Sequence, residues 1–168
     1  MRRKWIWALL IVLSAVAAYA GNVLATTPST PGFSGTTLAK ATFGEIDSHV
    51  HTVPAHWDEL IKTKGDSDLY VQQNTWQPGG STGWHTHPGP SLIIVTQGTV
   101  TEYDGDDATC TPHVYSANGA NSFVDVGGGA VHLIRNESAA VAQTIVVQLI
   151  PAGAVRREDA PDPGNCSF

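Results

Sequence analysis

Charged residues and cysteines are both scarce in this chain. Only 14% of its 168 residues are Asp, Glu, Lys or Arg, and there are two cysteines. Its nine basic residues form no cluster beyond Arg2, Arg3 and Lys4, and without these three the chain has 6 basic against 15 acidic residues. A chain with no basic surface cannot neutralise a row of phosphates, so we expect no nucleic acid partner.

A long helical period is missing as well. No stretch after residue 25 keeps an amphipathic helical period for more than two turns, and we find no internal repeat and no second domain. Short apolar runs alternate instead with turns that use many of the 17 Gly and 10 Pro. This pattern is typical of an all-β sandwich or barrel. Only Trp57 to Lys62 is expected to form a helical turn.

The first 25 residues have the layout of an export signal. The basic residues 2–4 precede an uncharged, largely apolar stretch over 5–20, and small residues follow. The segment is either a cleaved signal peptide or an uncleaved membrane anchor, because 5–25 is just long enough to span a bilayer. Either alternative places the domain outside the cytoplasm, secreted or anchored, with no other membrane contact. The Thr-, Ser- and Pro-rich segment 26–37 is expected to be a linker to a folded domain over 38–154.

The two cysteines, Cys110 and Cys166, agree with export. In an exported protein an even pair favours a disulfide, which would hold the C-terminal tail, 155–168, against the body of the domain. The alternative is two unrelated buried thiols.

The clearest chemical motif is Trp84-His85-Thr86-His87. Side chains two apart on a strand point to the same face, so His85 and His87 can meet one metal ion. Imidazole suits zinc, copper, iron and nickel, but two ligands alone make a weak site. A second pair, His49 and His51, lies among polar residues ahead of the barrel, and we expect it at the surface.

Glycines frame the His85 pair at characteristic distances. Gly79 stands six residues before His85, and Gly98 stands eleven after His87. Further on, His132 is followed four residues later by Asn136. These spacings resemble the two motifs of the cupin superfamily, over residues 79–98 and 119–136.

The resemblance implies a double-stranded β-helix, or jelly roll. It also implies that His85, His87 and His132 converge on one divalent metal ion inside the barrel, while Asn136 braces a turn. Cupins often pair through sheet edges, so a homodimer is expected too.

The chain departs from the cupin motifs at a carboxylate. The first motif usually carries Glu where this chain has Ser91 or Leu92, and the second usually carries Pro where it has Gly127. Gln97 and Glu102 are candidates for a fourth ligand or for a residue that contacts a ligand. The other interpretation of Glu102 is an exposed strand residue.

Three imidazoles without a carboxylate leave a bound ion strongly Lewis-acidic, with open positions for substrate, water or dioxygen. Cupins with a similar pattern hold iron(II) and oxidise thiols or diketones. The resemblance therefore implies an iron(II)-dependent dioxygenase acting on a small organic substrate, with manganese, zinc, nickel or copper as other candidate ions. The alternative is a non-catalytic extracytoplasmic cupin that binds a metal or a small ligand.

Overall fold

The computed structural model describes residues 31–52 and 56–168. The expected export signal lies outside these ranges, as do residues 26–30 of the expected linker. No helix within the two ranges has the length and apolar character that a membrane crossing requires.

The described residues form twelve strands. In chain order they are β1 (Phe33–Phe43), β2 (Asp47–Thr52), β3 (Trp57–Lys62), β4 (Ser67–Trp76), β5 (His85–Thr86), β6 (Ser91–Gln97), β7 (Thr99–Asp104), β8 (His113–Ser116), β9 (Ser122–Asp125), β10 (His132–Arg135), β11 (Ala142–Pro151) and β12 (Glu158–Asp159).

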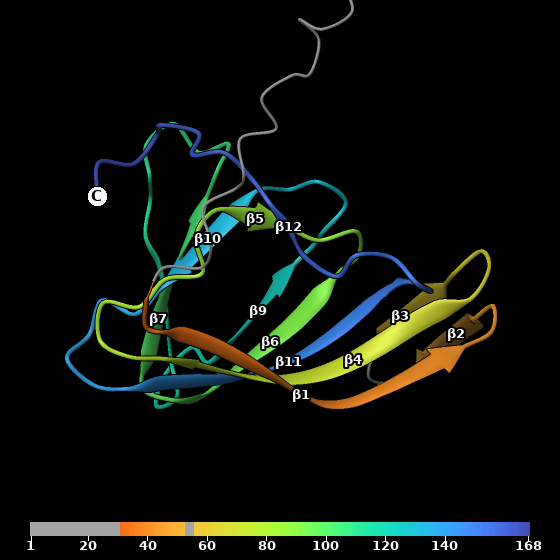
Figure 1. Ribbon diagram of the computed structural model, residues 1–168. Helices are drawn as coiled ribbons and strands as arrows, with labels where there is room; N and C mark the ends of the chain where they lie inside the picture. The colour runs from red at the N-terminus through yellow and green to blue at the C-terminus, as the bar shows by residue number, and fades with distance from the viewer. Residues whose placement is uncertain (1–30, 53–55) are drawn as a thin grey trace, which may run out of the picture.

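Two five-stranded antiparallel sheets face each other across the core (Figure 1). The first has the order β1-β4-β11-β6-β9 and the second β12-β5-β10-β7-β8. Because strands distant in sequence are neighbours in both sheets, the chain winds as a jelly roll. The expected all-β, double-stranded β-helix fold is confirmed.

The enclosed space changes character along the strands. On β6 the buried residues Val95, Ile93 and Ser91 alternate with exposed ones, and on β9 Phe123 and Asp125 are buried. One end of the barrel is therefore apolar and the other is polar. The apolar cluster consists of Trp76, Ile93, Val95, Val100, Phe123, Ile134 and Ala142, and the candidate site lies at the polar end.

The first strand begins earlier than predicted. β1 starts at Phe33, inside the segment 26–37 that was expected to be a linker. Its register with β4 runs from Phe33 opposite Trp76 to Phe43 opposite Ser67, and the Phe33 and Trp76 rings lie 5.0 Å apart between centroids. Apolar contact and a long hydrogen-bonded ladder thus draw the end of the segment into the sheet.

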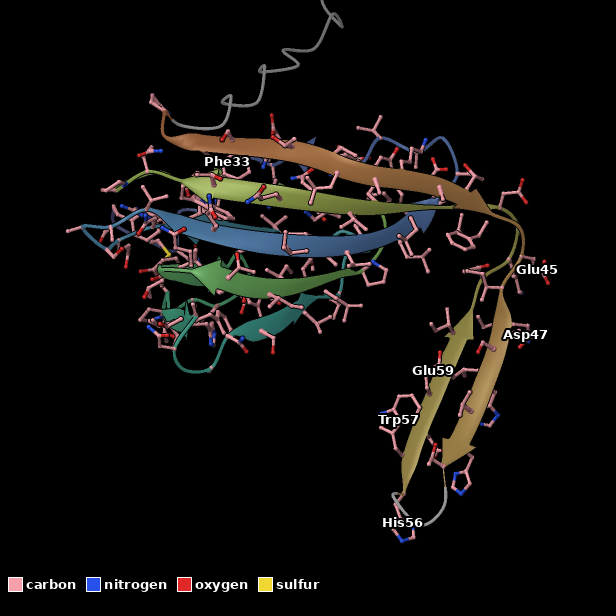
Figure 2. The ribbon with its side chains drawn as sticks, turned by 90° about the horizontal axis from the view of Figure 1, so that it is seen from below. Phe33, Glu45, Asp47, His56, Trp57 and Glu59 are labelled. Carbon is pink, nitrogen blue, oxygen red and sulfur yellow. A yellow bond between two sulfur atoms is a disulfide. The ribbon has the colours of Figure 1, made fainter. Side chains whose placement is uncertain are left out.

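The helical turn expected over Trp57–Lys62 is wrong, because this segment is β3. It pairs with β2 in a hairpin that Figure 2 shows extending away from the sheet that contains β1 and β4. Lys62 bonds to Asp47 at 2.7 Å, and His51 to Asp58 at 2.6 Å, both across the two strands. These cross-strand pairs outweigh a weak local helical preference. His49 and His51 lie on β2 and are exposed.

Cys110 and Cys166 form the expected disulfide. They pack with Trp84, Tyr103 and Leu133 on the outer face of the sheet that contains β7 and β10. The C-terminal tail thus covers this sheet and adds β12 to its edge, beside β5.

Candidate metal centre

Two paired strands, and the residue that directly follows one of them, bring the histidines together. His132 on β10 is the direct antiparallel partner of His85 on β5, so both side chains leave the sheet on the same face. His87 follows two residues after His85 and shares that face. The candidate ligand atoms of His85, His87 and His132 lie within 4.8 Å of one another. The predicted ligand set is therefore gathered at one point.

Backbone carbonyls fix the orientation of two of the rings. Nδ1 of His85 lies 2.9 Å from the carbonyl oxygen of Gly83, and Nδ1 of His87 lies 2.7 Å from that of Arg156. A carbonyl only accepts, so each Nδ1 carries the hydrogen and donates it. Each Nε2 is then left with a free lone pair, which is the form that a metal ion binds.

His132 differs from the other two. Its Nδ1 is buried without a hydrogen-bond partner, and it lies 3.6 Å from Oδ1 of Asp125. A buried polar atom without a partner costs free energy. A cation bound close to Nδ1 of His132 would offset part of that cost.

Burial keeps the three imidazoles neutral. It lowers the pKa of His85 well below its ordinary value, helped by the neighbouring charges of His132 and Arg157. Burial is also the main reason that the pKa values of His87 and His132 are lowered, although Asp125 acts in the opposite direction on both. Neutral imidazole is what a metal requires, so the site is ready to bind at neutral pH.

A cavity of about 180 Å³ opens beside the rings. Its apolar wall includes Phe33 and Ile134, and its polar wall includes Gln72 and Gln148. Arg156, from the segment before β12, also lines it. Its mixed lining suits a small, partly polar molecule.

The remaining predicted residues do not belong to the three-histidine cluster. Gln97 is exposed at the end of β6. Glu102 on β7 is 8% exposed, so the interpretation as an exposed strand residue is wrong. It points into the barrel because its register partner Ile134 does. Asn136 braces its turn as expected: Nδ2 donates to the carbonyls of Trp76 and Ala140.

Sequence reasoning missed Asp125. This residue is 5% exposed and lies 3.9 Å from Nε2 of His87, besides its approach to His132. A signal was present, because Asp125 stands two residues after Phe123 on a short strand and must share its inward face. The two carbonyls that orient His85 and His87 were missed too, since main-chain groups leave no trace in a sequence motif.

Three neutral imidazoles that converge on a buried point fit a divalent metal ion. The cluster can hold such an ion, and the adjacent cavity leaves room for a further molecule beside it.

No protein-family model matches the chain, and no curated protein matches it. Among solved structures, the chain is similar to an uncharacterised double-stranded β-helix protein from Klebsiella pneumoniae, with TM-score 0.49, 15% identity and coverage of 81% of this chain and 90% of that one. It is also similar to a cupin domain from Bordetella pertussis, with TM-score 0.44, 15% identity and coverage of 71% of this chain and 94% of that one. For a cupin superfamily protein from Desulfitobacterium hafniense, the TM-score is 0.42 and the identity 11%, with coverage of 68% of this chain and 81% of that one.

At these identities and TM-scores the similarities carry no argument about function, and the fold is assigned from the strand topology. The chain has the cupin, or double-stranded β-helix, fold, with three histidines gathered inside the barrel.

Proposed function

We propose that this protein is an extracytoplasmic, metal-dependent oxygenase that binds iron(II) through His85, His87 and His132 and acts on a small organic substrate. The observation that carries the proposal is the convergence of three neutral imidazoles, two of them with their Nε2 lone pairs freed by carbonyl contacts.

The cavity supports a reaction beside the ion. Iron(II) held by few protein ligands supplies coordination positions where a substrate and dioxygen can meet. Gln72 and Gln148 offer polar groups to orient a substrate, while Phe33, Ile93 and Ile134 limit the entry of water. A volume of about 180 Å³ restricts the substrate to a small molecule.

The disulfide supports a place outside the cytoplasm, where such bonds persist. Cell fractionation of the full-length chain tests this part of the proposal. Recovery in the cytoplasm with reduced cysteines would contradict it.

The test of the oxygenase begins with metal content. Protein purified without a metal-affinity tag is analysed for elements, reconstituted with iron(II) under anaerobic conditions and screened for oxygen uptake with diketones, thiols and phenols. We expect about one iron per chain and uptake with one substrate class. His132→Ala should lose the metal, whereas His113→Ala should keep it, because His113 is a half-exposed residue at the start of β8. Stoichiometric zinc, or oxygen uptake that no substrate stimulates, would contradict the oxygenase.

The alternative is a cupin that binds a metal or a small ligand without turnover. Burial of the ligands is compatible with it, because His85 and His132 are each 4% exposed and a buried ion can serve for structure or capture alone. A ligand that binds tightly and is recovered unchanged would support this alternative over the oxygenase.

A further inference from the structure

Asp125 is a buried carboxyl group that faces two of the three histidines. Its Oδ2 lies 3.9 Å from Nε2 of His87, and its Oδ1 lies 3.6 Å from Nδ1 of His132. Both distances are too long for a hydrogen bond. Two donor atoms that share one ion, however, lie up to about 4.2 Å apart, which is twice a metal–ligand bond of about 2.1 Å. The 3.9 Å between Oδ2 and Nε2 of His87, the nitrogen with the free lone pair, suits a shared ion better than it suits direct contact.

We propose that Asp125 is itself a ligand, so that the centre consists of three imidazoles and one carboxylate. This inference rests on the metal site of the proposed function and adds a ligand that the histidine motifs do not contain.

Charge balance leads to the same conclusion. A buried carboxylate needs a compensating positive charge. Within the described ranges, no Lys or Arg lies at ion-pair distance from Asp125, and its charged-group contacts are His87 and His132. Neither imidazole lies close enough to donate a hydrogen bond to the carboxylate. A divalent cation between the carboxylate and the rings provides it.

Local structure holds the carboxylate in place. The backbone N–H of Gly127 donates to Oδ1 at 2.9 Å, and the hydroxyl of Ser91 donates to Oδ2 at 3.3 Å. Ser91 and Asp125 are direct partners in the β6–β9 ladder, so their side chains enter the same space from neighbouring strands. The carboxylate thus reaches the interior opposite Ser91, the position at which the sequence lacks one.

The first experiment measures the affinity for cobalt(II) at neutral pH, by competition with a chelating dye. Asp125→Asn preserves the shape and still accepts from Gly127, but it removes the anionic ligand. We expect its affinity to fall by about 10–100-fold, the usual effect of disturbing a metal's surroundings, or more. The matched control is Asp47→Asn on the β2–β3 hairpin, where an exposed carboxylate bonds to Lys62. We expect the control to change the affinity less than about threefold, as for a screened surface charge.

The second experiment is a crystal structure of the cobalt-loaded wild-type protein, with the ion located by anomalous scattering. We expect an Asp125 oxygen within about 2.0–2.2 Å of the ion. An oxygen that instead contacts only Nδ1 of His132, and lies beyond bonding distance from the ion, would overturn direct ligation. This measurement needs no variant and stands even if Asp125→Asn does not fold.

The outcomes separate this inference from the proposed function. One outcome is that the wild type binds cobalt, His132→Ala does not, and Asp125→Asn binds as tightly as the wild type. This would support the three-histidine site and contradict Asp125 as a ligand. If the wild type binds no cobalt, both fall.

Discussion

At the scale of single residues, Glu102 is a buried carboxyl group close to two others. Burial, followed by repulsion from Asp104 and Asp125, raises its pKa to about 7, whereas an unfolded chain gives glutamate about 4.3. Between these values the native state keeps a proton that the unfolded state has lost. The free energy of unfolding of the metal-free protein therefore falls as the pH rises from about 4.3 through 7.

Glu102→Gln tests this dependence, because the amide has the same shape and cannot ionise. Between pH 5 and pH 8 the free energy of unfolding should fall in both proteins. We expect the fall to be smaller in the variant by about 1–3 kcal/mol. Urea denaturation of the chelator-treated proteins at both pH values measures the effect. Glu158→Gln, at an exposed position on β12, serves as the control. A wild-type pH dependence that survives in Glu102→Gln would show that other groups cause it.

Some residues of the site could be predicted from the sequence and others could not. The three histidines and Asn136 were predictable because each sits in a motif with fixed local spacing. Glu102 was not, since Pro88 and Pro90 interrupt the preceding strand ladder and leave the inward phase unsettled. The inward direction of Asp125 could have been inferred from Phe123, but its approach to His87 arises only when β9 pairs with β6.

At the scale of elements, the turn after β9 depends on two glycines with the same backbone conformation and different surroundings. Gly127 and Gly128 both have φ of +66°. A Cβ on Gly127 would lie 2.2 Å from the carbonyl oxygen of Gly89, whereas a Cβ on Gly128 would meet nothing within 4 Å. A proline ring fixes φ near –65°, which explains why this chain cannot carry the usual motif proline at position 127.

This pair gives a matched prediction. Gly128→Ala should cost about 1–2 kcal/mol, the strain of an alanine at positive φ. Gly127→Ala should cost at least about 2 kcal/mol more, because the main chain at position 127 and that at Gly89 must also move apart. Chemical denaturation of the two variants measures the difference. Equal losses would mean that the contact with Gly89 is relaxed in solution.

The short apolar runs between turns, from which the all-β fold was predicted, include those of β6 and β11, so these two strands were predictable. β3 was not, because its residues carry no clear period and become a strand only by pairing with β2. The beginning of β1 was missed for a similar reason, since the contact between Phe33 and Trp76 joins distant parts of the chain.

At the scale of the whole molecule, the disulfide joins the loop after β7 to the tail. Cys110 and Cys166 are 56 positions apart, so the bond closes a long loop. Further contacts hold the tail: the Phe168 ring lies 4.9 Å from that of Tyr103, and the Arg135 guanidinium lies 3.9 Å from the Phe168 ring centroid.

Replacing both cysteines by serine should lower the free energy of unfolding by about 2–4 kcal/mol, mainly because the unfolded chain gains freedom. Thermal unfolding of the two proteins measures the loss. The same contacts around Phe168 should keep the tail folded in the variant at moderate temperature, with unchanged protection of the Ala160 amide that donates to the Trp84 carbonyl. Two reactive thiols in the denatured, unreduced wild type would contradict the bond itself.

The contact between His87 and the carbonyl of Arg156 has a consequence for how this protein tolerates genetic change. The acceptor belongs to the main chain, so no substitution at position 156 deletes it. A library of variants at this position, sorted for metal retention, should therefore be permissive, although a ring of the centre depends on that residue. The side chain at such a position can change during evolution, while the main-chain carbonyl that orients the ring of His87 is retained.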